Sequence, residues 1–200
     1  MTRLLILRHG QTAWNAEERI QGQSDIDLDE AGVAQAAEAA KHIATFEPVL
    51  LVSSDLRRAA NTATALGAVT GLDIEYDPRL RERDYGSWQG LSVREIEERY
   101  PADFARWRAG SPLTDLGFES VDEVAKRATA AMRETADRAE GGCAVVVTHG
   151  HSGKAGLVGM LGWPQSVAYA LGGLENCHYA ELRHTSARGW QLRAYNVGPC

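Results

Sequence analysis

Three short runs of consecutive apolar residues, 4–7, 49–52 and 144–147, stand out along the chain. Polar residues do not alternate within them, which predicts strands covered on both faces, as is typical of a parallel sheet. Near the C-terminus, residues 177–185 and 189–197 instead alternate between apolar and polar side chains on either side of a turn at 186–189. This second pattern predicts a hairpin or two adjacent strands.

The segments between these runs carry apolar residues at helical spacing. Helices are predicted over 31–46, 56–71, 93–100 and 101–110, and a long amphipathic helix begins after Ser120 and ends at Gly141–Gly142. Ser53, Ser54 and Asp55 are expected to cap the second helix, and Gly71 to end it. Strands alternating with helices predict an α/β fold, a three-layer sandwich with a mostly parallel central sheet flanked by helices. No linker or low-complexity stretch divides the sequence, so residues 1–200 are predicted to form a single domain.

Composition limits the possible partners. Apolar residues make up 44% and charged residues 24% of the chain, as in soluble globular proteins. Acids outnumber bases by 27 to 21, which argues against a nucleic-acid partner, and no apolar run approaches the ~18 residues of a membrane span. Cys143, Cys177 and Cys200 lack metal-type spacing and are odd in number, which predicts reduced thiols and a cytoplasmic protein. A few arginines can still form a local pocket for an anionic small molecule.

Polar residues follow each of the three apolar runs. Because the carboxyl ends of parallel strands meet at one edge of a sheet, we expect these residues to converge there. The residues are Arg8 and His9 after the first run, Ser53 and Ser54 with Arg57 and Arg58 after the second, and Thr148, His149 and Gly150 after the last. Independent accidents at three strand ends are improbable, so this edge is the predicted functional site.

Arginines and histidines at one point indicate a phosphate site, because the guanidinium fork matches phosphate and helix N-termini at 53–55 and after Gly150 add donors. A neutral histidine nitrogen can attack phosphorus and form a phosphohistidine. Glu82 is the candidate that protonates the leaving alkoxide, and Asp84 is its rival. A metal site at His149 and His151 is a weak alternative, since no third ligand is evident.

Five separated motifs, LILRHGQTAWN, RIQGQSDIDLDEAG, SSDLRRAANTA, LRERDYGSWQG and VVVTHG, resemble in order those of the histidine phosphatase superfamily, the phosphoglycerate-mutase-like family. The resemblance implies that His9 is the phosphorylated nucleophile, that Arg8, Arg58 and His149 complete the phosphate pocket, and that Glu82 is the proton donor. It favours Arg58 over Arg57, and it implies neither metal nor cofactor. The substrate-binding residues that it implies are Gln11, Thr12, Asn15, Gln21, Gly22, Tyr85, Gly150 and His151.

The compact middle of the chain, with Ser92–Val93 where mutases carry Asn-Lys, resembles the phosphatases of the family, especially actinobacterial ones. The expected partner is therefore a small-molecule phosphate ester of the sugar phosphate or phosphoglycerate type. Two alternatives are kept, a cofactor-dependent phosphoglycerate mutase and a non-catalytic phospho-ligand module, and a homodimer is left open. His151 and the GFES stretch at 117–120 depart from the usual motifs. His151 could alter leaving-group selectivity or point to solvent, and Glu119 could contact the pocket or be an acid at a helix start.

Overall fold

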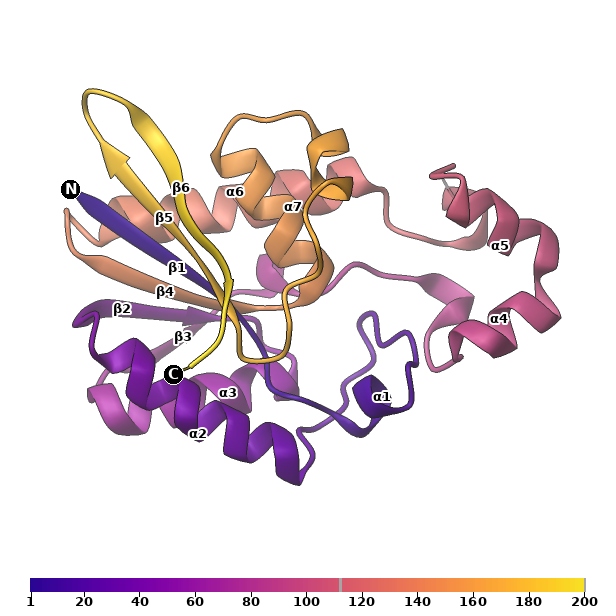
Figure 1. Ribbon diagram of the computed structural model, residues 1–200, viewed down its shortest axis with the longest axis horizontal. Helices are drawn as coiled ribbons and strands as arrows, with labels where there is room; N and C mark the ends of the chain where they lie inside the picture. The colour runs from indigo at the N-terminus through magenta and orange to yellow at the C-terminus, as the bar shows by residue number, and fades with distance from the viewer. Residues whose placement is uncertain (112, 200) are drawn as a thin grey trace.

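The computed structural model describes residues 1–111 and 113–199, which contain a six-stranded sheet of order β3-β2-β4-β1-β5-β6 (Figure 1). The strands are β1 Thr2–Arg8, β2 Pro48–Ser53, β3 Ile74–Tyr76, β4 Cys143–Thr148, β5 Tyr179–Thr185 and β6 Gly189–Val197. The α-helices are α1 Ala13–Ala16, α2 Glu30–Ala44, α3 Arg57–Thr70, α4 Val93–Arg99, α5 Pro101–Arg108, α6 Val121–Arg138 and α7 Gly150–Met160. Short 3-10 helices occupy Pro78–Leu80, Gly86–Trp88, Thr114–Leu116 and Gln165–Tyr169.

The sheet is parallel at its centre and antiparallel at one edge. β3, β2, β4 and β1 run parallel, whereas β5 and β6 pair antiparallel beside β1. The predicted mostly parallel sheet and the C-terminal hairpin are therefore confirmed. β3 was not predicted, because its three residues are too few to give a pattern and two of them are exposed.

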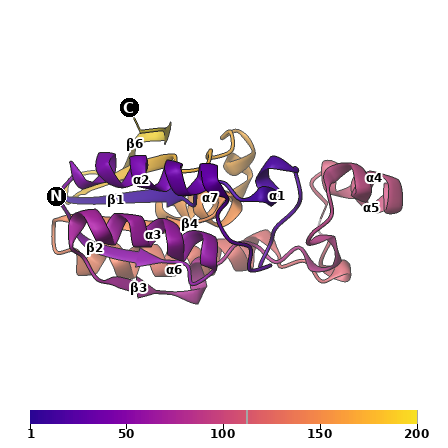
Figure 2. The same ribbon diagram turned by 90° about the horizontal axis from the view of Figure 1, so that it is seen from below.

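Helices cover both faces of the sheet (Figures 1 and 2). Leu5 and Leu7 of β1 pack with apolar residues of α2 and α3, whereas Leu4 and Ile6 pack with those of α6 and α7. Alternate side chains thus enter two separate cores, so every position of the strand is apolar. This arrangement confirms the three-layer sandwich and makes the centre of the sheet a rigid support for whatever follows its strands.

The end of α6 and the capping of α3 differ most from the prediction, while the other predicted helix ends agree within two residues. α6 ends at Arg138, before Gly141, because Glu140 (φ 46°) and Gly141 (φ 88°) adopt left-handed conformations that turn the chain toward β4. At the start of α3, the N-cap is Leu56 and has no side-chain cap. The predicted caps were therefore wrong, and the N–H of Arg57 is instead satisfied by a carboxylate from a distant loop, that of Asp25.

α4 and α5 project from one end of the sandwich and form a separate outer lobe, defined here as residues 86–111 and 113–118 (Figures 1 and 2). The lobe has a small hydrophobic core of its own, made of Trp88, Ile96, Phe104, Leu113 and Phe118. It is joined to the loop before α2 by backbone hydrogen bonds between Ile20 and residues 90 and 91. The lobe is thus a distinct packing unit attached to the carboxyl edge of the sheet.

Two further predictions concern membranes and thiols. Within the described residues, no helix combines the length and the apolar character needed to cross a membrane. Cys143 and Cys177 are buried free thiols, and Cys200 lies outside the described residues.

Candidate active site

The first and last motifs meet at the carboxyl edge of the sheet. β1 and β4 are neighbours with Arg8 paired to Thr148, and the N–H of His9 donates to the Thr148 carbonyl at 3.0 Å. The rings of His9 and His149 are consequently 5.1 Å apart between centroids. The two histidines are thus neighbours because their strands are neighbours.

His9 is held in a single tautomer. Its Nδ1 lies 2.7 Å from the carbonyl oxygen of Gly10, which can only accept, so Nδ1 carries the proton and Nε2 keeps its lone pair. Burial, with the nearby charges of Arg58 and Arg8, holds the pKa of His9 well below its usual range, despite the opposing hydrogen bond to Gly10. The side chain therefore presents an unprotonated, uncharged nitrogen at neutral pH.

Two buried guanidinium groups lie beside His9. Arg8 donates from Nη1 to the carbonyl of Leu174 at 2.5 Å, while its Nε is buried without a hydrogen-bond partner among the described residues. Arg58 is fully buried, and burial lowers its pKa to about 10, although Glu82 and Asp25 oppose the shift. Both groups remain charged at neutral pH. An unpartnered buried N–H is costly, so this edge is arranged for a ligand that accepts hydrogen bonds.

His149 orients Arg58 through a hydrogen bond. The Nε of Arg58 donates to His149 Nδ1 at 3.1 Å, so Nε2 carries the proton and donates to Ser54 Oγ at 2.8 Å. Burial, followed by the charge of Arg58, holds the pKa of His149 well below its usual range. The ring is therefore neutral, with both nitrogens engaged, and it fixes the direction of the Arg58 guanidinium.

Glu82 lies at the N-terminus of α7. Its carboxylate accepts backbone N–H groups from His151 at 3.0 Å, Ser152 at 3.0 Å and Arg83 at 2.8 Å. Burial alone would raise the pKa of Glu82, but the neighbouring His151 ring and these three N–H donors outweigh burial and lower it. The helix N-terminus after Gly150, which was expected to bind phosphate, thus binds this carboxylate.

A cavity of about 200 Å³ connects these groups. Its wall includes Arg8, His9, Arg58 and Glu82. His149 contacts Arg58 but does not line the cavity. The other lining residues are Asn15, Arg19, Ile20, Gln21, Gly22, Tyr85, Val93 and Trp107. With two guanidinium groups and one buried carboxylate near a neutral histidine, the cavity is suited to an anion. Asp84 does not line it and instead accepts the N–H of Gly86 at 2.8 Å.

Known proteins resemble the chain throughout its length. The model of the histidine phosphatase superfamily (branch 1) matches residues 4–198. Glucosyl-3-phosphoglycerate phosphatase of Mycobacterium tuberculosis is 39% identical over 210 residues, covering 98% of this chain and 94% of the relative. Metal-independent phosphoserine phosphatase of Arabidopsis thaliana is 37% identical over 154 residues, covering 75% and 65%. A solved structure of mycobacterial glucosyl-3-phosphoglycerate phosphatase, complexed with VO3, has a TM-score of 0.88 at 37% identity and covers 99% and 100%.

The chain belongs to the histidine phosphatase superfamily. The predictions of family, fold class and phosphatase class are confirmed by these comparisons.

The predicted substrate-binding residues fall into two groups. Asn15, Gln21, Gly22 and Tyr85 line the cavity around His9. Gln11, Thr12, Gly150 and His151 do not line it. Gln11 Nε2 donates to Asp29, and Thr12 is buried and caps α1. Gly150 lies where a Cβ would be 3.7 Å from Arg8 Nε, and His151 lines a second cavity.

The remaining candidates also have definite positions. Arg57 is exposed and forms an ion pair with Asp25, which explains why its neighbour Arg58 is the arginine of the cavity. Ser53 Oγ donates to the carbonyl of Ser54, and Thr148 Oγ1 donates to the carbonyl of Leu80. Within the described residues, no group of three or more His, Cys, Asp or Glu side chains is arranged to hold a metal ion.

Several residues at the site were not predicted; Ile20 and Val93 add apolar wall to the cavity, and three others make more specific contributions. Asn176 donates to the carbonyl of His9 at 2.9 Å and to Asn15 Oδ1 at 3.3 Å. Arg19 donates to the carbonyl of Gly90 and to Glu95 Oε2, so it links the cavity to α4. Trp107 enters from α5. Arg19 lies within a family motif and could have been chosen, whereas nothing in the sequence marks Asn176 or Trp107.

A larger cavity of about 540 Å³ adjoins the first and shares Tyr85 and Trp107 with it. Arg83, Arg108 and His151 contribute to its wall. Neither of these two arginines forms an ion pair with another described residue. The site therefore has two compartments, a small cationic one at His9 and a wider one beyond Tyr85.

Proposed function

We propose that this protein is a metal-independent phosphomonoesterase that forms a phosphohistidine at His9. The observation that carries the proposal is the state of His9. Its Nδ1 proton is held by the Gly10 carbonyl, and its Nε2 is uncharged in a cavity that also contains Arg8 and Arg58. A free nitrogen nucleophile beside fixed cations suits attack on phosphorus.

In the first half-reaction, the Nε2 lone pair of His9 forms the P–N bond as the P–O bond to the alcohol breaks. Arg8 and Arg58 stabilise the charge on the phosphoryl oxygens, and His149 keeps Arg58 directed at them. Glu82 protonates the leaving alkoxide. In the second half-reaction the Glu82 carboxylate takes a proton from water, whose oxygen attacks phosphorus and breaks the P–N bond.

The low pKa of Glu82 raises the question of where its proton comes from. In the free enzyme the carboxyl group is ionised, but the second pKa of a phosphate monoester is about 6, so part of the substrate arrives as a monoanion. When the monoanion binds beside ionised Glu82, it brings one proton that the phosphate and the carboxylate share. Transfer of that proton to Glu82 relieves the repulsion between the carboxylate and the bound phosphate.

The substrate is proposed to be a small phosphorylated metabolite of the sugar phosphate or phosphoglycerate type. The larger cavity beyond Tyr85 has room for the alcohol, and relatives are named for glucosyl-3-phosphoglycerate and phosphoserine. We further propose that residues 1–200 act as one domain in the cytoplasm. The family match over residues 4–198 and the buried free thiols of Cys143 and Cys177 are consistent with this view.

The test is a phosphate-release screen over sugar phosphates, phosphoglycerates and p-nitrophenyl phosphate, with a chelator present. A parallel assay measures phosphoglycerate mutase activity with a bisphosphate primer. Phosphate release together with an alkali-stable phosphoenzyme at His9 is the expected result. Primer-dependent isomerisation without phosphate release would instead support the mutase. Absence of turnover with binding of inorganic phosphate would support the non-catalytic module.

A further inference from the structure

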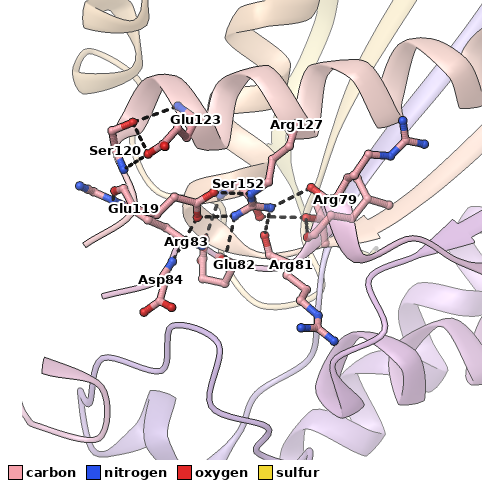
Figure 3. Close-up of polar contacts among 12 residues, drawn as sticks. Arg79, Arg81, Glu82, Arg83, Asp84, Glu119, Ser120, Glu123, Arg127 and Ser152 are labelled. Atoms are coloured by element: carbon pink, nitrogen blue, oxygen red, sulfur yellow. Dashed lines mark hydrogen bonds and ion pairs between the residues drawn. The ribbon is translucent and has the colours of Figure 1, made fainter. Parts of the chain in front are cut away.

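Arg127 of α6 lies outside both cavities, yet it contacts the segment that carries Glu82 (Figure 3). Its Nη1 donates to the carbonyls of Arg79 at 2.8 Å and Arg81 at 2.5 Å, and its Nη2 donates to the carbonyl of Glu82 at 3.0 Å. Three backbone carbonyls of this segment therefore converge on one guanidinium group. Within this segment the carbonyl of Leu80 accepts from Thr148 Oγ1 at 2.8 Å instead, so Arg127 holds the carbonyls on either side of it.

Glu119 completes the arrangement. Arg127 Nε donates to its Oε1 at 2.6 Å and Nη2 to its Oε2 at 2.8 Å, so all five N–H groups of Arg127 are engaged. The backbone of Glu119 accepts from Arg83 Nε at 2.7 Å and donates to the carbonyl of Asp84 at 3.0 Å. The pair thus holds the chain on both sides of Glu82, and Glu119 lines neither the cavity at His9 nor the one beyond Tyr85.

The carboxyl group of Glu82 is fixed from another direction. It accepts the N–H groups of His151 and Ser152 at the start of α7, a helix that packs closely on α6, where a Cβ on Gly156 would meet Met132 at 2.6 Å. The backbone of Glu82 is therefore set by α6 and its side chain by α7. Loss of the α6 contacts would leave the carboxyl group attached to α7 on a displaced backbone.

We propose that Arg127, oriented by Glu119, is the positioning residue of the general acid Glu82, an inference that rests on the function proposed above. Arg127 sets the distance between the Glu82 carboxyl group and the leaving oxygen. Its contribution is therefore to protonation of the leaving alkoxide, and not to phosphate binding by Arg8 and Arg58. A displacement of about 1 Å in such a group costs about 10²-fold in rate.

Leaving-group dependence separates this role from a merely structural one. Phenyl phosphate needs protonation because its phenol has a pKa of about 10, as in tyrosine, whereas nitrophenolate leaves with little help. For R127Q we expect kcat/KM on phenyl phosphate to fall by about 10²-fold and on p-nitrophenyl phosphate to change by less than about threefold. The matched control is R138Q on the same helix, which removes only an exposed ion pair with Glu75. It should leave unchanged the ratio of kcat/KM on phenyl phosphate to kcat/KM on p-nitrophenyl phosphate.

E119Q provides a second variant if R127Q does not fold, because the amide keeps its shape but weakens the hold on Arg127. E119Q should lower the phenyl to p-nitrophenyl ratio of kcat/KM less than R127Q does. The proposal is overturned if R127Q and E119Q lower kcat/KM equally for phenyl phosphate and p-nitrophenyl phosphate, or leave both unchanged. It is also overturned if R138Q shows the same selective loss on phenyl phosphate. Failure of the unaltered enzyme to hydrolyse either ester would instead overturn the proposed function.

Discussion

The carboxyl edge of the sheet and the outer lobe make different contributions to the site. Arg8 ends β1, and His9 and His149 directly follow β1 and β4, two neighbouring strands with buried centres. The polar partners of His9 are groups fixed by the sheet or its loops. The outer lobe instead contributes Trp107 and Arg108 from α5, supported by a small aromatic core. In the proposed mechanism the sheet edge therefore holds the phosphate, and the lobe faces the alcohol.

Under the proposed function, the chemistry and the choice of alcohol are assigned to different parts of the fold. Groups that must be placed within fractions of an ångström follow strands that are buried on both faces. The groups proposed to face the alcohol lie on a unit with a small core of its own, separate from the sheet. Substitutions on the two sides should therefore have different consequences.

The largest effect is expected on the sheet side, from His9→Asn. The amide cannot form the phosphoenzyme, so kcat should fall by about 10⁴-fold or more with every ester, whatever its alcohol. Phosphate release and phosphoenzyme trapping provide the measurement, and the melting temperature serves as a folding control. Retention of even a tenth of the activity would show that His9 is not the nucleophile.

Glu82→Gln should produce the next largest effect. An amide cannot donate a proton to the alkoxide, so alkyl phosphates should lose about 10²- to 10⁴-fold in kcat. p-Nitrophenyl phosphate should lose far less, since its leaving group is stable as an anion. If the two kinds of ester lose the same factor, Glu82 does not act as the acid.

The convergence of the sheet-side residues could be predicted from the sequence for a physical reason. Arg8 is the last residue of β1, His9 and His149 directly follow β1 and β4, and parallel strands necessarily bring their ends together. The directions in which loop side chains point could not be predicted from the sequence. Gln11 and Thr12 stand next to the site in the chain, but local hydrogen bonds direct them to Asp29 and α1.

Residues that reach the site by tertiary packing were invisible to the sequence pattern. Trp107 and Arg127 lie on helices with ordinary amphipathic patterns, and only the docking of α5 and α6 gives them a role. The capping of α3 failed for the same reason, because Asp25 is distant in sequence from Arg57. Patterns within one segment cannot reveal a partner supplied by another.

Phe104→Ala tests whether the outer lobe is an independent unit. Phe104 is buried in the lobe core and stacks on Trp107 at 5.7 Å, so its truncation should destabilise that core by about 3–5 kcal/mol. Hydrogen exchange should then quicken in α4 and α5 while protection of β1 and β4 persists. Equal acceleration in the strands would mean that the lobe and the sheet unfold together.

The pH dependence tests the protonation states on the sheet side. The lowered pKa of His9 keeps it neutral in mild acid, while the lowered pKa of Glu82 means that the productive proton must arrive on the substrate. For an alkyl phosphate, kcat/KM should therefore fall by about tenfold per pH unit above pH ~6, where the ester becomes a dianion. Glu82→Gln should lack this descending limb. A flat profile between about pH 5 and 8 in the unaltered enzyme would contradict the assignment.

The smallest effect is expected on the lobe side, from Arg108→Gln. Arg108 is exposed and lines only the larger cavity, where it lies over the Phe104 ring at 6.0 Å. An exposed charge pair contributes about 0.2–1 kcal/mol, so the preference for 3-phosphoglycerate over its methyl ester should fall by no more than about fivefold. Inhibition by inorganic phosphate should stay unchanged, because that ligand occupies the cavity of Arg8 and Arg58. A loss of phosphate inhibition in this variant would show that the two cavities are not separable, and an unchanged ester preference would place the carboxylate away from the lobe.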